Sequence, residues 1–303
     1  MSDFVIETKK LTKIYGEQTA VSSVDIHVKP GRIYGLLGRN GAGKTTIMKM
    51  ILGLTPITSG EVDVFGQNIK GHEKRIYPRI GAIIETPGFY PNLTGTENLE
   101  IFAKLRGTPR SNAVKNALEV VGLPYRDKKL FSKYSLGMKQ RLGIANAILH
   151  DPELLILDEP TNGLDPAGIE EMRELIKTLP KQYGMTVMIS SHILSEIDQM
   201  ATVVGIINQG CLIFQERMSV LDMQREPQIV LRTSDNNRTY QLLKKTNPQR
   251  TADGLQIGAL SDEQIGAVVQ CLCSNGISVY RVEEHRESLE DIFLNLTGKE
   301  LTL

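Results

Sequence analysis

The N-terminal stretch of the chain alternates apolar and polar positions with the period of a β-strand. Val24, Ile26 and Val28 are apolar, and polar residues stand between them. In a β-strand, alternate residues point to opposite faces, so this pattern is typical of a sheet with one face against a core. We therefore predict an antiparallel sheet within residues 4–35.

Continuous apolar runs predict a second kind of sheet further along the chain. Residues 33–37, 80–84 and 154–157 contain only apolar residues and glycine, and residues 186–191 form another strand-like segment. A run without alternation is typical of a strand that is buried on both faces of a mostly parallel sheet. These runs, separated by helical segments, predict an α/β fold.

Helical patterns fill the space between the strands. Thr94 and Glu97 have the spacing of a capping box, and further helices are predicted at residues 113–121 and 139–149. We expect an α-helical subdomain over about residues 87–150, inserted into the sheet domain. The other helices of this part are predicted at residues 46–52 and 167–179.

The sequence changes character after residue 226. A polar, uneven stretch precedes a predicted helix at residues 262–275 and a predicted strand at residues 277–282. A last helix at residues 288–296 opens on a second capping box, Ser288 and Asp291. We predict a first domain over residues 1–226 and a small α+β accessory domain over residues 227–303.

Composition and charge exclude several classes of protein. Among the 303 residues, Lys+Arg and Asp+Glu both number 35, so no basic excess favours nucleic-acid binding. No apolar run approaches the ~18 residues of a membrane span, and the N-terminus lacks the pattern of a signal peptide. We expect a cytoplasmic protein that binds no nucleic acid, whose three cysteines are ordinary thiols.

The segment after the strand at residues 33–37 has the pattern G-x-x-x-x-G-K-[ST], the phosphate-binding loop. Glycines let backbone N–H groups turn toward phosphate oxygens at the N-terminus of the following helix. Lys44 would bring a positive charge to the β- and γ-phosphates, and the Thr45 hydroxyl would bind Mg²⁺. The candidate nucleotide-binding residues here are Gly38, Arg39, Asn40, Gly41, Ala42, Gly43, Lys44, Thr45 and Thr46.

Two acids and a histidine follow buried strands. Asp158 and Glu159 come directly after the apolar run at residues 154–157, and His192 follows the strand at residues 186–191. Ligands bind at the carboxyl ends of parallel strands, where Asp158 could hold Mg²⁺ and Glu159 could activate a water molecule. The acids could instead cap the next loop, and a lone histidine is more often structural.

Three weaker signals leave alternatives open. Tyr15 could stack on adenine or pack within its own strand. Ser135 and Gly137, just before a helix, could form a second anion-binding site or a simple helix cap. The loop at residues 87–91, with two prolines and two aromatic residues, could be a docking surface or a structural turn.

Taken in order, these elements resemble the nucleotide-binding domain of ABC transporters over residues 4–222. The resemblance implies a P-loop NTPase fold, with a RecA-like mostly parallel sheet, an antiparallel β subdomain and a helical subdomain. The matching segments are Tyr15 for the adenine-stacking aromatic, residues 38–45 for the phosphate loop, 135–138 for the signature loop, 154–159 for the second nucleotide motif, 162–165 for the dimer-contact loop, and His192 for the switch histidine.

Two departures from the family pattern affect this interpretation. The signature Leu-Ser-Gly-Gly-Gln is Tyr-Ser-Leu-Gly-Met here, which keeps Ser135 and Gly137 but replaces a glycine with Leu136. Glu85 stands where most of the family has glutamine, a residue that reaches the Mg²⁺. Glu85, with the segment after it, and the tail at residues 288–294 are similar to bacitracin exporters and lantibiotic self-protection transporters.

The resemblance also implies roles for the site residues. Glu159 would be the general base, His192 would hold the γ-phosphate and the attacking water, and Lys44 would stabilise charge on the phosphoryl oxygens. The metal ligands would be Thr45, Asp158 and Glu85. Tyr15, the phosphate loop, Ser135 and Gly137 would bind ATP.

The same resemblance implies partners and a location. Two copies would face each other head to tail, with each ATP between the phosphate loop of one and the Ser135 loop of the other. A separate transmembrane permease would anchor the dimer at the cytoplasmic side of the membrane. The function expected is ATP-driven efflux of a peptide antibiotic or drug. The alternatives are an exporter of another cargo and a soluble ABC ATPase without a transport role.

Overall fold

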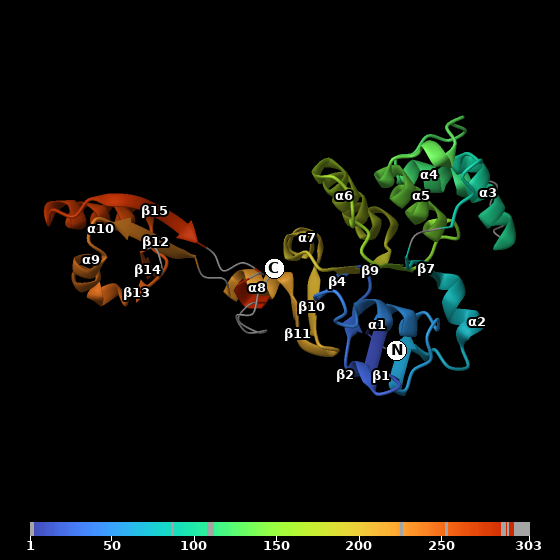
Figure 1. Cartoon of the computed structure of the whole chain (residues 1–303), viewed down its shortest axis with the longest axis horizontal. Helices are drawn as coiled ribbons and strands as arrows, with labels where there is room; N and C mark the ends of the chain where they lie inside the picture. Colours follow the sequence, from blue (N-terminus) through green and yellow to red (C-terminus); the bar gives the residue numbers. More distant parts are fainter. Residues whose placement is uncertain are drawn as a thin grey trace. The chain divides into compact units, whose positions relative to one another are not determined.

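The computed structural model describes residues 3–85, 88–107, 112–224, 227–251, 254–285, 289 and 291–293. By its internal contacts the chain divides into two compact units, Met1–Met218 and Ser219–Leu303. The first unit contains two β-sheets and the second contains one, and each unit has its own cluster of buried apolar residues (Figure 1).

The first unit begins with an antiparallel sheet, as the alternating pattern predicted. Its strand order is β2–β1–β5–β6, and β3 also pairs with β1. Val24, Ile26 and Val28, the apolar positions of the pattern, are all buried. The strands are β1 (Ile6–Tyr15), β2 (Gln18–Val24), β3 (His27–Val28), β5 (Ser59–Val64) and β6 (Gln67–Asn68).

A six-stranded sheet in the order β11–β10–β4–β9–β8–β7 forms the centre of this unit. All neighbouring strands are parallel except β10 and β11, so the predicted mostly parallel sheet is confirmed. No prediction covered β10 and β11. The strands are β4 (Ile33–Leu37), β7 (Ile80–Ile83), β8 (Leu154–Leu157), β9 (Thr186–Ser191), β10 (Val203–Asn208) and β11 (Cys211–Arg217).

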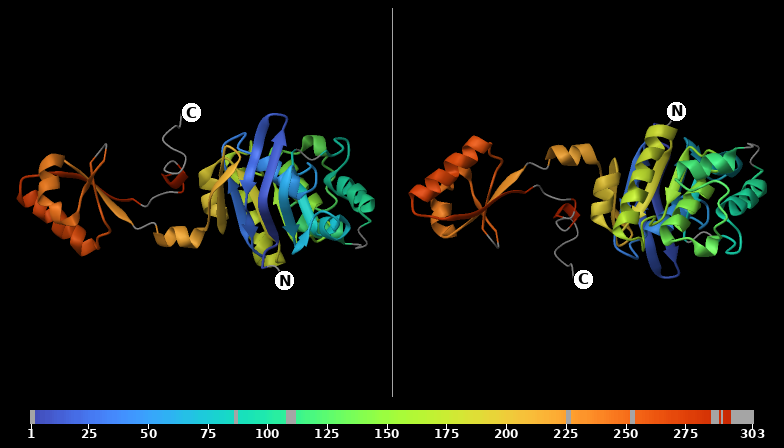
Figure 2. Two further views of the ribbon diagram at one scale, coloured as in Figure 1. Left: turned by 90° about the horizontal axis from the view of Figure 1, so that it is seen from below. Right: turned by 90° about the horizontal axis from the view of Figure 1, so that it is seen from above.

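Both faces of the central sheet are covered. Helix α1 (Lys44–Ile51) lies between it and the antiparallel sheet, and its buried residues Ile47, Met48, Met50 and Ile51 belong to the core shared by both sheets. Helices α5 (Leu136–Ile148), α6 (Pro166–Tyr183) and α7 (Leu194–Met200) lie on the opposite face. Figure 2 shows the antiparallel strands in front from one side and the helices in front from the other. This double covering explains why β4, β8 and β9 are buried along their whole length.

The segment between β7 and β8 is helical, as predicted. It contains α3 (Gly95–Leu105), α4 (Ala113–Val120) and α5. The capping box is present, because the Glu97 backbone N–H donates to Thr94 Oγ1 and the Thr94 N–H donates to the Glu97 carboxylate. Helix α5 begins at Leu136, three residues before the predicted start, because the Ser135 hydroxyl caps it by accepting from the Met138 N–H.

Helix α6 also differs from its prediction. It continues to Tyr183, although Pro180 made an end at residue 179 reasonable. The helix ends where Gly184 adopts a left-handed φ of 67° and its N–H donates to the Pro180 carbonyl oxygen. A short helix, α2 (Glu73–Ile76), precedes β7.

The second unit has a four-stranded antiparallel sheet in the order β13–β14–β12–β15. The predicted helix at residues 262–275 is confirmed as α10. The predicted strand at residues 277–282 lies two residues later, and the polar stretch before α10 contains unpredicted elements. The elements are α8 (Met218–Gln224), β12 (Gln228–Thr233), α9 (Asn236–Leu242), β13 (Gln249–Arg250), β14 (Leu255–Ile257), α10 (Asp262–Ser274) and β15 (Val279–His285). The predicted capping box at Ser288 lies outside the described residues.

None of the described helices combines the length and the apolar character needed to cross a membrane.

Candidate functional site

The glycine-rich loop joins β4 to α1, the arrangement that its sequence motif requires. Gly43 has a left-handed φ of 108°, and a Cβ atom there would lie 2.7 Å from the Ala20 carbonyl oxygen. At Gly38 a Cβ would lie 2.6 Å from the Ile207 carbonyl oxygen. Both positions therefore exclude a side chain, and the loop can adopt this path only with glycine.

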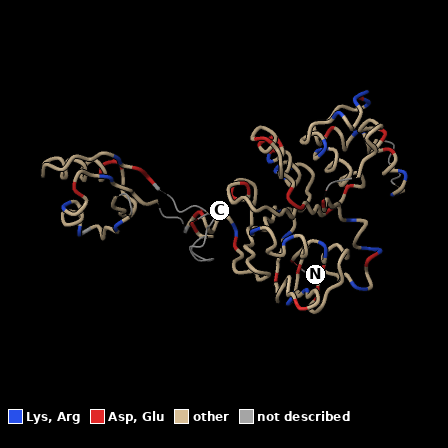
Figure 3. The backbone as a smooth tube through the Cα atoms, in the orientation of Figure 1, with Lys and Arg blue, Asp and Glu red and all other residues tan. Residues whose placement is uncertain are grey.

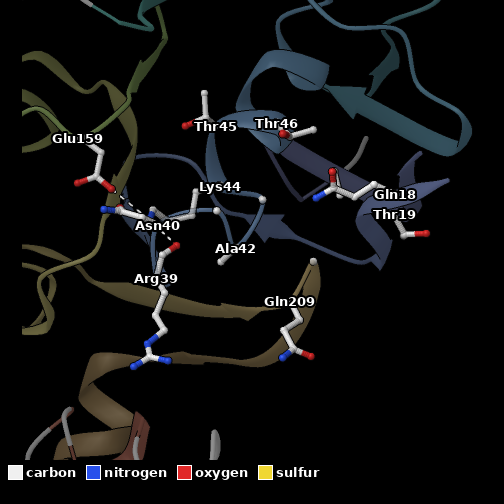
Figure 4. Close-up of a pocket in the computed structure, with 14 residues that line it drawn as sticks. Gln18, Thr19, Arg39, Asn40, Ala42, Lys44, Thr45, Thr46, Glu159 and Gln209 are labelled. Atoms are coloured by element: carbon white, nitrogen blue, oxygen red, sulfur yellow. Dashed lines mark hydrogen bonds and ion pairs between the residues drawn. The ribbon is translucent and has the colours of Figure 1, made fainter. Parts of the chain in front are cut away.

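Lys44 is the first residue of α1 and is almost completely buried, with 5% of its side chain exposed. Its ammonium group donates hydrogen bonds to the carbonyl oxygens of Gly38 at 2.6 Å and Arg39 at 3.3 Å. The carboxylate Oε1 of Glu159 lies 3.1 Å from the same nitrogen (Figure 4). A buried ammonium needs such compensation. The loop thus holds a fixed positive charge at the N-terminus of α1.

Glu159 contacts both Lys44 at the start of α1 and His192, the residue that follows β9. It follows β8 with a left-handed φ of 48°, and its second carboxylate oxygen, Oε2, lies 2.8 Å from His192 Nδ1. Because a carboxylate only accepts hydrogen bonds, the Nδ1 atom carries the proton in this pair. Lys44, Glu159 and His192 thus form a continuous chain of interactions across the carboxyl ends of β4, β8 and β9.

Asp158 connects α1 to β9 through two hydrogen bonds. The Thr45 hydroxyl donates to Asp158 Oδ2 at 2.7 Å, and the Ser190 hydroxyl donates to Asp158 Oδ1 at 2.6 Å. The Ser190 oxygen also accepts the Glu159 backbone N–H at 2.9 Å. Ser190, which sequence reasoning did not select, therefore holds both acids in place.

The phosphate loop lines a cavity of about 400 Å³. The side chains of Glu159, Thr45 and Thr46 line it, and Figure 4 shows them beside the phosphate loop. Five lining residues were missed from the sequence because they come from a distant strand and a turn whose sequence carries no motif. They are Gln18, Thr19 and Ala20 of β2, and Gln209 and Gly210 between β10 and β11.

Tyr15 is not one of the residues that line this cavity. It is the last residue of β1, and its side chain is about half exposed. The ammonium group of Lys13 lies 4.6 Å from the centre of its ring. The ring is therefore accessible to a ligand while it also contacts Lys13 of its own strand, so both interpretations of Tyr15 stay open.

Ser135 and Gly137 lie in a separate hollow of about 620 Å³, which shares no lining residue with the phosphate-loop cavity. Leu164 and Asp165 of the predicted dimer-contact loop line the same hollow. The side chain of Leu136, the residue that departs from the family signature, is close enough that a Cβ at Gly163 would meet it at 3.1 Å. The two loops thus form one surface.

Glu85 is not one of the residues that line the phosphate-loop cavity. Its side chain is 72% exposed, and its Oε1 accepts a hydrogen bond from the Lys49 ammonium group at 2.7 Å. This hydrogen bond lowers the pKa of the Glu85 carboxyl group. Lys49 lies on α1, five residues after Lys44. Of the predicted docking loop, Pro87 lies outside the described residues, and Tyr90 is exposed.

Comparisons with known proteins agree with this geometry. A family model described as ABC transporter matches residues 21–162, and a model described as "AAA domain, putative AbiEii toxin, Type IV TA system" overlaps it at residues 127–198. The bacitracin transport ATP-binding protein BcrA of Enterococcus faecalis is 48% identical over 98% of this chain and 97% of its own length. The lantibiotic transport ATP-binding protein SrtF of Streptococcus pyogenes is 44% identical over 70% of this chain and 90% of its own.

Solved structures show the same fold. CbiO1 from Clostridium perfringens, part of the ABC transporter complex cbiONQ, has a TM-score of 0.67 at 26% identity, over 74% of this chain and 92% of its own. A dimeric structure of the ATP-binding cassette MJ0796 bound to ADP and Pi has a TM-score of 0.62 at 25% identity, over 70% of this chain and 98% of its own. With relatives similar over nearly its whole length and a phosphate loop beside two acids, the chain belongs to the family of ABC transporter ATP-binding proteins and is an ATPase.

Proposed function

We propose that this chain is the ATP-hydrolysing subunit of an exporter that removes a peptide antibiotic through a separate transmembrane permease. The observation that carries the proposal is the convergence of Lys44, Glu159 and His192 beside the Thr45–Asp158 pair. The similarity to bacitracin and lantibiotic transport proteins supports the class of cargo.

The phosphate-loop cavity suits the triphosphate of ATP. Backbone N–H groups at the start of α1 and the Lys44 ammonium group offer positive charge to phosphate oxygens. Lys44 now donates to loop carbonyls and to Glu159, and it would exchange these acceptors for the β- and γ-phosphates. Tyr15, at the end of β1, is the residue we assign to stacking on the adenine ring.

The oxygen atoms of Thr45 and Asp158 fit a magnesium ion. They are hard ligands 2.7 Å apart, and Mg²⁺ at such sites is commonly bound by one or two protein groups together with phosphates and waters. The described residues contain no cluster of three or more carboxylate, histidine or cysteine ligands, so an all-protein metal cage is not part of this site. When bound, Mg²⁺ would neutralise charge on the β- and γ-phosphate oxygens.

Glu159 is positioned to act as the general base. Its carboxylate lies between the Lys44 ammonium group and His192 Nδ1, so it faces the place where the γ-phosphate would lie. It would accept a proton from the attacking water, and His192 would orient that carboxylate and bind the γ-phosphate. Lys44 would stabilise the charge that develops on the transferred phosphoryl oxygens.

One copy holds only half of the components that the cycle needs. The Ser135 loop does not line the phosphate-loop cavity of its own chain. We therefore infer a head-to-tail homodimer in which Ser135 and Gly137 of one copy contact the ATP bound by the other. ATP would join the two copies, and its hydrolysis would release them, which moves the permease at the cytoplasmic face of the membrane.

Coexpression with the permease tests this function directly. We expect the pair to raise the bacitracin or lantibiotic resistance of a sensitive bacterium, and Lys44→Ala to abolish that gain. The purified complex should show ATPase activity that the same peptide stimulates. ATPase activity without peptide stimulation and without resistance would contradict the cargo class and leave the ATPase assignment intact. No activity from a complex that binds ATP would contradict the catalytic assignment.

A further inference from the structure

Lys13 is a buried lysine that the proposed mechanism does not use. It lies on β1 and is 7% exposed. Figure 3 shows basic and acidic residues interspersed around the antiparallel sheet, and the exposed Lys9 of the same strand pairs with Asp63 at 3.1 Å. Among the residues that the structure describes, no carboxylate pairs with the Lys13 ammonium group. Removing a charge from water is costly, so this group needs other partners.

The Lys13 ammonium group has a carbonyl oxygen and an aromatic ring as partners. It donates a hydrogen bond to the Pro56 carbonyl oxygen at 2.8 Å. It also lies over the Tyr15 ring, 4.6 Å from the ring centre. The π electrons of an aromatic ring attract a cation at this distance, and most strongly where water is excluded. Lys13 therefore covers one face of the Tyr15 ring, and a base can stack only on the opposite face.

The segment before β5 fixes the position of the Lys13 side chain. The Thr58 backbone N–H donates to the Thr12 carbonyl oxygen at 3.1 Å, and the Ile14 N–H donates to the Thr58 hydroxyl group at 3.1 Å. Thr12 and Ile14 are the neighbours of Lys13 in the chain, and the bond from Lys13 to Pro56 lies between these two contacts. The end of β1 is thus tied to residues 56–58, so the ammonium group meets the ring from a fixed position.

Tyr15 lies beside the phosphate-loop cavity without lining it. In the hairpin of β1 and β2, Tyr15 is directly opposite Gln18, and Gln18 lines the cavity. Directly opposed residues of an antiparallel pair point to the same face of the sheet. The Tyr15 side chain, which is about half exposed, is therefore on the face of the hairpin that borders the cavity. The base of a nucleotide whose phosphates lie in the loop would reach this face.

We propose that Lys13 is a positioning residue for the nucleotide base, which holds the Tyr15 ring from one face so that the other face stacks on adenine. It rests on the proposed function, in which Tyr15 stacks on adenine. A ring that is held in advance loses less conformational freedom when the base binds, so the nucleotide binds more tightly. The positive charge behind the ring also attracts the π electrons of the stacked base. Lys13 does not line the phosphate-loop cavity, so its contribution is confined to the base.

Ligands with and without a base separate this role from a structural one. ADP and inorganic pyrophosphate, each with Mg²⁺, both carry a diphosphate group, and neither is hydrolysed as ATP is. In calorimetric titrations of the full chain, Lys13→Met should weaken ADP binding by roughly 3- to 30-fold, the range of a cation–π contact, and leave pyrophosphate binding unchanged. Lys13→Arg should keep most of the ADP affinity, since a guanidinium group also stacks on aromatic faces. Lys9→Met removes the same charge from an exposed position of β1, and as the matched control it should change neither affinity.

A Tyr15→Leu variant shows whether Lys13 acts through the ring. Tyr15→Leu should weaken ADP binding, and adding Lys13→Met to it should cause no further loss. The proposal would be overturned by unchanged ADP affinity in Lys13→Met, by an equal loss for ADP and pyrophosphate, or by a loss that persists in full without the Tyr15 ring. In each of these cases weaker ADP binding by Tyr15→Leu would still support stacking. If Tyr15→Leu binds ADP as the wild type does, the stacking assignment fails and the role of Lys13 fails with it.

Discussion

Glu159 Oε1 lies 3.1 Å from Lys44 Nζ, although one residue follows β8 and the other begins α1. The two side chains are 20% and 5% exposed, so this pair is largely shielded from water. Lys44 thus holds the carboxylate beside the phosphate-loop cavity, and His192 contacts the other carboxylate oxygen at 2.8 Å.

This relationship predicts the behaviour of Glu159→Gln. The amide keeps the size of the side chain but cannot accept a proton, so ATP should bind while hydrolysis falls roughly 100-fold or more. ATP retained after rapid gel filtration, together with the steady-state ATPase rate, measures both effects. Glu153→Gln, at an exposed carboxylate that pairs with Arg79, is the matched control and should keep its activity.

The same variant tests the shared site. Glu159→Gln should form a dimer with ATP and Mg²⁺ and should remain a monomer without them. A protein that holds ATP but remains monomeric would contradict the head-to-tail arrangement.

The sequence predicted the parts of the site whose residues are close together in the chain. The phosphate loop and the acids at residues 158 and 159 stand next to apolar runs, so both the motif and its strand could be read together. The structure adds which strands are neighbours: β8 lies beside β9, which lies beside β4. That order brings His192 to Glu159, and no local pattern encodes it, because it depends on packing between distant segments.

Other features could not be predicted for the same reason. Ser190 is an ordinary polar residue in a strand until Asp158 is placed beside it. Gln18 and Gln209 line the cavity because the fold brings β2 and the β10–β11 turn beside the phosphate loop. The polar residues on the exposed face of β12 kept its sequence from predicting a strand. Strands β10 and β11 contain no candidate site residue, so no motif indicated them. Local sequence patterns identified the chemical groups of the site, whereas the order of the strands in the sheet determines how those groups are arranged.

Ser190→Ala should loosen both acids at once. Ser190 donates to Asp158 and accepts from the Glu159 N–H, and it is fully buried. Removing its hydroxyl leaves a backbone donor without that acceptor, which should lower the free energy of unfolding by about 1–3 kcal/mol. The Mg²⁺ concentration that half-saturates ATPase activity should rise several-fold, since Asp158 is less well oriented. Denaturant unfolding and a Mg²⁺ titration measure the two effects, and a variant with unchanged Mg²⁺ dependence would show that Ser190 has only a structural role.

The contact between Glu85 and Lys49 predicts opposite changes in ATPase activity for two variants. We expect Glu85 to leave Lys49 and approach the Mg²⁺ when ATP binds. Glu85→Gln removes that charge and should lower both ATPase activity and drug resistance several-fold. Lys49→Met removes the competing partner and should raise basal ATPase activity. Both are measured on the complex with the permease. If neither ATPase activity nor resistance changes in Glu85→Gln, the carboxylate has no special role here.

His150 predicts a pH dependence of stability. Its Nε2 lies 3.1 Å from the Ile80 carbonyl oxygen, and burial lowers the pKa of its imidazole, with the nearby Arg106 acting in the same direction. The folded chain therefore keeps His150 neutral below pH ~6.5, where the unfolded chain takes up a proton. The free energy of unfolding should fall as pH decreases from about 6.5 toward the lowered pKa of the folded state.

The variant His150→Gln keeps a donor for the Ile80 carbonyl but does not titrate. Wild type should therefore lose more stability than this variant between about pH 7.5 and about pH 5.5. Urea unfolding at both values measures the difference, and His72→Gln, at an exposed position, is the control. Equal losses in wild type and in His150→Gln would show that His150 does not contribute to the acid sensitivity.

A buried carboxylate connects the two loops that carry Glu159 and His192. Glu196, on α7, is 3% exposed. Its Oε2 accepts hydrogen bonds from the Thr161 hydroxyl at 2.6 Å and the Ser191 hydroxyl at 3.0 Å. Thr161 lies two residues after Glu159, and Ser191 directly precedes His192, so Glu196 is suited to fix the distance between the general base and the histidine that orients it.

Glu196→Ala should therefore reduce kcat more than KM, because ATP binding relies on the phosphate loop, whereas hydrolysis relies on the Glu159–His192 geometry. Glu196→Gln should recover much of the rate, since its amide oxygen can still accept from both hydroxyl groups. Gln199→Ala, at an exposed position on the same helix, controls for a change in α7. Steady-state kinetics of the three variants measure this. Equal losses in Glu196→Ala and Glu196→Gln, or a change in KM alone, would mean that Glu196 stabilises the fold without positioning the catalytic pair.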